Sequence, residues 1–211
     1  MRFRDRYEAG QLLAQELESL RGCKDALVLG IPRGGVVVAY EVAKELGLPL
    51  DVYITRKIGA PHNPELAVGA VASDGTLVLD DDLIRRMAVS IDYVHAETER
   101  QREEIKRRLA AYRGSRPEPE FRDKTILLVD DGVATGATVL ASLRALNQHE
   151  LAELVLAVPV GPPDTIRSLS QEADRVVCLQ TPRIFWAVGA FYSDFGQTSD
   201  AEVKELLQEL Q

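Results

Sequence analysis

An apolar run that stops at two aspartates is the feature that most constrains the fold of this 211-residue chain. Residues 125–129 read Thr-Ile-Leu-Leu-Val, Asp130 and Asp131 follow, and a turn of small residues (132–138) leads into an apolar helical segment. A strand without polar alternation is typical of a parallel sheet that helices cover on both faces. The sequence therefore predicts an α/β fold.

A second strand–turn–helix unit lies near the start of the chain. The apolar run 26–30 precedes Pro-Arg-Gly-Gly at 32–35, a helical stretch that ends before Gly47, and a strand predicted at 50–55. This order is that of a βαβ unit, which favours a Rossmann-like, mainly parallel sheet flanked by helices. Further helices are expected over 5–20, after the turn at 132–138 to about residue 147, starting at about 163, and after Ser199. Further strands are expected over 153–159 and near 175–179.

The middle of the chain follows a different pattern. Residues 56–66 contain Gly59, Pro61 and Pro64, which predicts an irregular loop. Two apolar runs, 67–72 and 76–79, flank Ser-Asp-Gly and predict a hairpin. The three aspartates at 80–82 are interpreted as a helix N-cap and first turn rather than a metal site.

A long, charge-rich helix is predicted next. It covers 91–113, with a narrow apolar stripe at Ile105, Leu109 and Tyr112, and a Gly- and Pro-containing linker at 114–119 follows it. Because the helix lies between the hairpin and the next strand, we expect a helical insertion over about 80–120 that covers one end of the fold.

Composition excludes several classes of protein. Acidic residues outnumber basic ones by 33 to 25, so the formal net charge of −8 disfavours nucleic-acid and anionic-membrane binding. No apolar stretch approaches the roughly 18 residues of a membrane span, and no apolar run follows the basic N-terminus as in a signal peptide. Cys23 and Cys178 form no metal-binding or disulfide pattern and are expected to be inert thiols, which suits a cytoplasmic location.

The turn at 132–138 has the composition of an anion site. Its Gly and Ala residues let backbone amides approach a phosphate, Thr135 and Thr138 add hydroxyl donors, and a helix N-terminus adds partial positive charge. Two carboxylates would repel phosphate, so Asp130 and Asp131 are expected to bind sugar hydroxyls and a hydrated Mg²⁺. The pattern indicates a site for a phosphorylated sugar. Neither a Walker A loop nor a dinucleotide fingerprint is present.

The segment Val-Asp-Asp-Gly-Val-Ala-Thr-Gly-Ala-Thr at 129–138 resembles the ribose-phosphate motif of the type I phosphoribosyltransferases, and nearly the whole chain resembles a subgroup of uncharacterised phosphoribosyltransferase-domain proteins. The resemblance implies that the chain binds 5-phosphoribosyl 1-pyrophosphate with Mg²⁺ and transfers the phosphoribosyl group to a nitrogen nucleophile, a nucleobase, with release of pyrophosphate. It also implies that Asp130 and Asp131 bind the ribose and the metal. The ribose-5-phosphate site would comprise these two acids with Gly132, Val133, Ala134, Thr135, Gly136, Ala137 and Thr138.

Three further segments match the family. Pro-Arg-Gly-Gly at 32–35 is similar to its pyrophosphate loop, which implies a cis peptide at or next to Arg33. Arg56 and Lys57 resemble the start of a flexible catalytic loop that would cover about 56–75. The pyrophosphate-binding residues implied are Arg33, Gly34, Gly35, Arg56 and Lys57, and the catalytic ones are Asp130, Asp131, Arg33 and Lys57.

The end of the chain resembles the family's hood, a small subdomain that contacts the nucleophile. It would comprise about 181–197 with the chain ends, and Phe185 and Trp186 would either stack on a base or pack within the hood. The expectation is thus one domain over 1–211.

Several alternatives stay open at this point. Family members acting on 6-oxopurines carry an acid where this chain has Ala134, so hypoxanthine and guanine are disfavoured and the nucleophile is unidentified. A non-catalytic regulator that senses the same ligand or a nucleotide is the alternative function. A homodimer is a candidate assembly because the fold class often dimerises.

Overall fold

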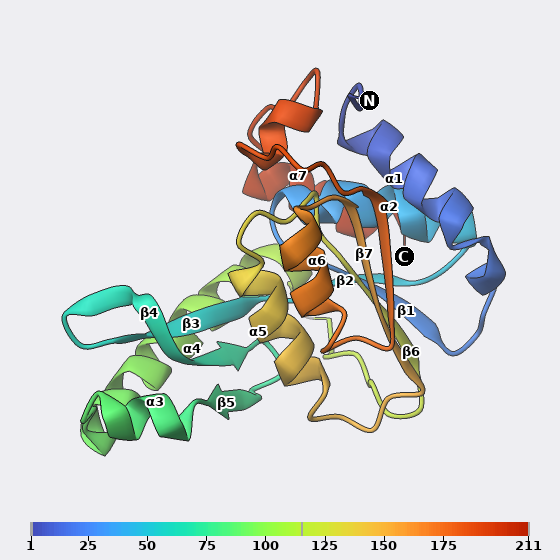
Figure 1. The fold of residues 1–211 in the computed structure, drawn as a ribbon. Helices are drawn as coiled ribbons and strands as arrows, with labels where there is room; N and C mark the ends of the chain where they lie inside the picture. The colour runs from blue at the N-terminus through green and yellow to red at the C-terminus, as the bar shows by residue number, and fades with distance from the viewer. Residues whose placement is uncertain (1, 115, 211) are drawn as a thin grey trace.

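A five-stranded parallel sheet forms the centre of the protein. The computed structural model describes residues 2–114 and 116–210, with only the backbone of Glu65 (Figure 1). Every neighbouring pair of strands in the order β2-β1-β6-β7-β8 is parallel. This confirms the predicted α/β architecture. The strands are β1 (Ala26–Gly30), β2 (Leu50–Val52), β6 (Thr125–Val129), β7 (Glu153–Val160) and β8 (Arg175–Gln180).

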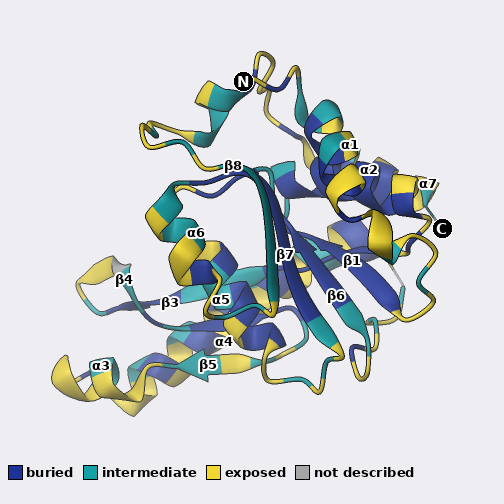
Figure 2. Ribbon diagram, turned by 45° about the vertical axis from the view of Figure 1, so that its right-hand side comes forward, coloured by how far each residue is buried: buried dark blue, intermediate teal, exposed yellow. Residues whose placement is uncertain are grey.

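Helices cover both faces of this sheet, as the unbroken apolar strands require (Figure 2). Alternate strand residues contribute to two separate apolar clusters: Leu127 lies in the first and Leu128 in the second. The first cluster includes α1 (Arg6–Glu16), α2 (Gly34–Leu46) and α7 (Asp200–Glu209), and the second includes α5 (Ala137–Leu146) and α6 (Pro163–Leu169). Two short 3-10 segments, η1 (Glu18–Leu20) and η2 (Val188–Phe191), complete this part.

A three-stranded antiparallel sheet projects from the body beside α5 (Figure 1). It contains β3 (Thr55–Ala60), β4 (Asn63–Ala72) and β5 (Leu77–Leu79), and it leads into α3 (Asp81–Arg86) and α4 (Ile91–Arg113). Ile58 and Val68 pack with Val94 of α4 in a small third cluster, while α5 also contacts all three strands. The projecting sheet therefore has its own small core.

The predicted loop at 56–66 is wrong. These residues belong to the β3–β4 hairpin, whose register shifts on both sides of Gly59. Gly59 is needed there because a Cβ would lie 2.8 Å from Pro64 Cα. Pro64 is tolerated because β5 pairs with β4 only at 69–71, so no strand hydrogen-bonds it on that side. Bulges and an edge position thus accommodate the residues that indicated a loop.

The strand predicted at 50–55 is also too long. β2 ends at Val52, and β3 begins at Thr55 in the other sheet. The chain passes from one sheet to the other between them, where Tyr53 N–H donates to Gly30 O and Ser73 N–H donates to Ile54 O. The apolar pattern continues through this change because Tyr53 and Ile54 are buried on either side of it.

Most other predicted elements are confirmed. The hairpin turn at 73–75 joins β4 to β5, and α4 spans the predicted 91–113. Asp80 caps α3 by accepting from Leu83 N–H, and Ser199 caps α7 by accepting from Glu202 N–H. Apart from Ser115, which lies outside the described residues, 114–124 carry no helix or strand, as expected of a linker.

The two cysteines, Cys23 and Cys178, are unpaired and half-buried. Burial raises the pKa of the Cys178 thiol to about 11, which agrees with an inert thiol. No helix within 2–114 and 116–210 is both long and apolar enough to cross a membrane.

Candidate functional site

Two loops meet at neighbouring strand ends. Since β1 and β6 are adjacent and parallel, the turn after β1 lies against Asp130 and Asp131 after β6. A Cβ at Gly34 would lie 2.0 Å from Asp131 Oδ2, and one at Gly35 would lie 2.7 Å from Asp130 Oδ1. Both glycines are therefore required by close approach to the acid pair. The structure brings the two sequence motifs into direct contact.

The turn after β1 has the backbone expected of it. The Pro32–Arg33 peptide is cis, at the position that the sequence analysis expected, and the Arg33 side chain is exposed. α2 begins directly after it, at Gly34.

The helices of the described chain differ in whether a side chain caps their N-termini. Side chains of Asp5, Asp80, Ser90 and Ser199 cap α1, α3, α4 and α7. The N-cap residues of α2 (Arg33), α5 (Gly136) and α6 (Pro162) form no side-chain cap, and at α5 Thr135 Oγ1 accepts from Ala137 N–H at the long distance of 3.5 Å. Because their N-cap residues form no side-chain cap, α2 and α5, which are 13 and 10 residues long, can offer first-turn amides to a ligand or water.

The loop between β6 and α5 exposes its backbone. Ala134, Thr135, Ala137 and Thr138 are exposed. Gly136 has φ 73°, a left-handed conformation that favours glycine, and it turns the chain into α5. The predicted ribose-phosphate residues 130–138 therefore lie together at the carboxyl end of the central strand β6, where an exposed loop leads into α5.

The acid pair is held in an environment that opposes ionisation. Burial raises the pKa of Asp130 well above its usual range, and the neighbouring Asp131 charge raises it further. Burial also raises the pKa of Asp131, although Arg6 partly offsets that increase. A cationic ligand or hydrogen-bond donors at these carboxylates would stabilise their ionised form.

Two residues that the sequence analysis did not identify fix Asp131. Arg6 Nε donates to Asp131 Oδ2 at 2.7 Å, and Tyr192 OH donates to Asp131 O at 2.6 Å. They are 125 and 61 residues away in the chain. The one available signal was Arg6 at the first position of a helix, where the helix dipole disfavours a cation.

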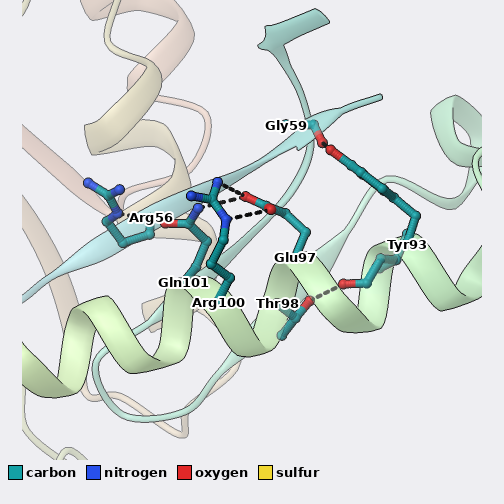
Figure 3. A network of polar contacts seen from close by, with 8 residues as sticks. Arg56, Gly59, Tyr93, Glu97, Thr98, Arg100 and Gln101 are labelled. Atoms are coloured by element: carbon teal, nitrogen blue, oxygen red, sulfur yellow. Dashed lines mark hydrogen bonds and ion pairs between the residues drawn. The ribbon is translucent and has the colours of Figure 1, made fainter. Parts of the chain in front are cut away.

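Arg56 belongs to a network of polar contacts with helix α4 (Figure 3). Its Nε donates to Gln101 Oε1 at 2.8 Å, and Gln101 Nε2 donates to Glu97 Oε1 at 2.6 Å. Glu97 also pairs with Arg100 at 2.6 Å. The Arg56 side chain therefore contacts α4 in this structure.

Lys57 faces the other side of the hairpin, because side chains alternate along a strand. It lines a cavity of about 690 Å³ between the antiparallel sheet and α5, together with Ala137 and Leu140. The structure thus places Lys57 beside the first turn of α5, and Arg56 on the opposite face of β3.

A residue near the N-terminus pairs with the segment 191–193, which lies within the range predicted as hood. Phe3 N–H donates to Phe191 O, and Ser193 N–H donates to Phe3 O. Phe185 stacks on Phe191 with ring centroids 5.2 Å apart, whereas Trp186 is 87% exposed. A Cβ at Gly132 would lie 2.6 Å from Val188 Cγ1, so this region packs directly on the loop between β6 and α5. Phe185 packs within the region, and Trp186 is available to a ligand.

The acid pair alone does not make a metal cage. No group of three or more His, Cys, Asp or Glu side chains suited to a metal occurs in the part of the chain that is described. Asp130 and Asp131 nevertheless fit Mg²⁺, which proteins commonly bind through one or two carboxylates while substrate oxygens and water supply the other ligands. The two carboxylates therefore suit a Mg²⁺ ion whose other ligands come from a bound substrate and water.

Comparisons with known proteins agree with this geometry. The family model for the phosphoribosyl transferase domain matches residues 6–195. Two curated Mycobacterium tuberculosis proteins, MT0597 and Rv0571c, each named "Putative phosphoribosyl transferase", are 46% identical to the chain over 205 residues, which is 97% of this chain and 46% of each relative. The chain thus spans about half the length of these curated relatives.

A solved structure is similar throughout. The crystal structure of TT1426 from Thermus thermophilus superposes with a TM-score of 0.90 at 47% identity, covering 100% of this chain and 99% of that one. The similarity therefore includes the projecting sheet and the hood region as well as the central sheet.

Proposed function

The chain belongs to the phosphoribosyl transferase domain family, and we propose that it binds 5-phosphoribosyl 1-pyrophosphate with Mg²⁺ and transfers the phosphoribosyl group to a nitrogen nucleophile, a nucleobase, with release of pyrophosphate. The bond from ribose C1 to the pyrophosphate oxygen breaks, its electron pair leaves with pyrophosphate, and a C1–N bond forms. The nucleophile's proton passes to solvent, because Ala134 offers no base in the loop.

One observation carries the proposal: the N-termini of α2 and α5, whose N-cap residues form no side-chain cap, lie with the two carboxylates after β6 at the ends of the adjacent strands β1 and β6. Amides bind phosphate groups, and carboxylates accept hydrogen bonds from hydroxyls. A sugar with a phosphate at one end and a diphosphate at the other matches that order of groups. In this assignment the loop 132–138 binds the 5-phosphate and the turn 33–35 binds the diphosphate.

The acid pair would hold the sugar through its hydroxyl groups. Asp130 and Asp131 lie at the sheet edge with their backbone positions determined by β6. As the C1–O bond breaks, positive charge develops on the ribose ring, and the two carboxylates stabilise it. The same two residues would hold Mg²⁺, which supplies charge neutralisation to the diphosphate when bound.

Cations of this chain would contact the leaving pyrophosphate. Arg33 lies next to the amides of Gly34 and Gly35, where the α2 dipole adds to its charge. Lys57 would act from the hairpin, and Arg56 would have to exchange its contact with Gln101 for one with the diphosphate. Negative charge accumulates on the pyrophosphate as it leaves, so these cations would stabilise the transition state more than the bound substrate.

The acceptor would bind on the hood side. Trp186, with its ring 87% exposed, is proposed to stack on a planar base, and Phe185 supports the segment from behind through Phe191. The proposed organisation is one phosphoribosyltransferase domain in nucleotide metabolism, with the hairpin as catalytic loop, α3 and α4 as an insertion, and 181–197 with the chain ends as hood.

Two measurements test the proposal. Calorimetry with millimolar 5-phosphoribosyl 1-pyrophosphate and Mg²⁺ should show Mg²⁺-dependent binding, and absence of heat would refute the site. A pyrophosphate-release screen over purine and pyrimidine bases, amines and orotate should identify the acceptor. Binding without turnover across that panel would instead favour the ligand-sensing regulator.

A further inference from the structure

Arg6 lies where three segments that are distant in the sequence meet. Its Nε donates to Asp131 Oδ2 at 2.7 Å, its Nη1 donates to Gly196 O at 2.8 Å, and its guanidinium carbon lies 3.8 Å from the centroid of the Phe195 ring. Building on the proposed function, we propose that Arg6 is a positioning residue, which orients the Asp131 carboxylate for the ribose and links that orientation to the hood.

The location of Arg6 is unfavourable for α1 itself. Arg6 is the first residue of the helix, where the helix dipole repels a cation, and the N-cap is already formed by Asp5. Arg6 therefore gains its stabilisation from tertiary contacts. The side chains of Arg6 and Asp131 are only 12% and 15% exposed, so this ion pair is far less screened than one on the surface.

The contacts use the shape of a guanidinium as well as its charge. Two separate N–H groups of the planar fork donate to Asp131 and Gly196, while the flat face covers Phe195. A lysine ammonium has the charge but neither the planar fork nor the stacking face. This geometry predicts that lysine will replace Arg6 only in part.

The same contacts restrict how Asp131 can present its carboxylate. Oδ2 accepts from Arg6 and lies 2.0 Å from the place where a Gly34 Cβ would be, so that oxygen is enclosed by the diphosphate turn and α1. Tyr192 OH holds the backbone of the same residue through Asp131 O. The Oδ1 side is left for a ribose hydroxyl. Arg6 and Tyr192 thus connect the acceptor side of the site to the ribose side.

A double-mutant cycle tests this role. Binding of 5-phosphoribosyl 1-pyrophosphate with Mg²⁺ is measured by calorimetry for wild type, Arg6→Met, Asp131→Asn and the double variant. We expect Arg6→Met to weaken binding about tenfold in the wild-type background and less than about twofold in the Asp131→Asn background, because coupled residues are non-additive. Arg6→Lys should weaken binding by about threefold, between wild type and Arg6→Met.

Arg4→Met is the matched control. Arg4 pairs with Asp5 at 2.8 Å and its side chain is 66% exposed, so its loss should leave binding unchanged. Equal losses from the Arg6 variants in both backgrounds, or no loss in either, would overturn the proposal and leave Arg6 a purely structural contact. If thermal unfolding shows that Arg6→Met does not fold, Arg6→Lys in the two backgrounds decides in the same way. A wild type that binds no ligand would overturn the proposed function, and this role with it.

Discussion

The two sheets of this protein contribute to the candidate site in different ways. The five-stranded sheet presents Asp130, Asp131 and two loop backbones at strand ends, and its core residues, such as Leu128 and Leu156, are fully buried. The three-stranded sheet presents Arg56 and Lys57 on opposite faces of one strand, over a core of a few residues.

In the first sheet the positions of the binding groups depend on the backbone, and in the second they depend on side-chain conformation. At the parallel sheet, the anion-binding amides follow directly from the strand and helix positions. At the projecting sheet, the cations are long side chains, and Arg56 already has a partner on α4. In the proposed site, the part assigned to phosphate and ribose is therefore formed in advance, whereas the part assigned to the cations would depend on exchange of contacts.

The largest effect is expected at Gly34. A valine there would drive its Cβ against Asp131 Oδ2, so Gly34→Val should reduce ligand affinity more than about 100-fold, as misplacement by an ångström can. It should also lower the free energy of unfolding by about 1–3 kcal/mol. Calorimetry and chemical denaturation measure the two effects.

The control is a glycine of the projecting sheet. Gly75 has φ 82° with nothing within 4 Å of its Cβ position, so Gly75→Ala should cost about 1–2 kcal/mol through backbone strain alone. Its ligand affinity should equal that of wild type. If Gly34→Val binds the ligand normally, the turn after β1 can move away from Asp131. The view that the parallel sheet forms its part of the site in advance would then be wrong.

Asp130→Asn should weaken ligand binding about tenfold and yet stabilise the free protein at neutral pH. Because the folded-state pKa of Asp130 is raised, its contribution to stability is complete below the unfolded pKa, near 4, and decreases as pH rises through the raised value. Asparagine does not ionise, so the Asp130→Asn variant does not lose this stability as the pH rises. We expect its melting temperature to exceed that of wild type by about 2–4 °C at pH 7–8 and to lose this advantage near pH 4.

A pH series of thermal melts checks the sign. Asp164→Asn is the control, because it makes the same carboxylate-to-amide change at a side chain that is 92% exposed and lies outside the acid pair. A variant less stable than wild type at pH 8 would show that the charged acid pair is already compensated within the protein.

Arg56→Ala and Gln101→Ala test the exchange at the hairpin. If Arg56 moves to the diphosphate, Arg56→Ala should weaken binding about fivefold, whereas Gln101→Ala should leave the affinity equal or tighter. Both should lower the melting temperature, since Gln101 is 4% exposed and links Arg56 to Glu97. If both variants have the same affinity, Arg56 does not contact the diphosphate and serves only in its contact with α4.

The smallest stability effect is expected in the hood. Trp186→Ala should change the free energy of unfolding by less than about 0.5 kcal/mol, because its ring is 87% exposed. Phe185→Ala should cost about 1–2 kcal/mol by removing the stack on Phe191. Once an acceptor is identified, Trp186→Ala should raise its KM several-fold. An unchanged KM would contradict the stacking role.

Local signals predicted the elements that depend on local chemistry. The caps at Asp80 and Ser199, the stop at Gly47 and the turn at 73–75 are confirmed because each rests on hydrogen bonds or backbone angles within a few residues. The β3–β4 hairpin was missed because its Gly and Pro residues indicate a loop unless bulges and an edge position are known.

The sequence by itself determined the α/β architecture and the contiguous loop from Asp130 to Thr138, since a buried strand, an acid pair and a helix start are written in consecutive residues. Only the tertiary structure decided which side chains act on that loop. Arg6 and Tyr192 reach Asp131 from 125 and 61 residues away, and strand alternation directs Arg56 to α4 and Lys57 toward α5. Such choices follow from strand order and packing across the sheet, which no local pattern contains.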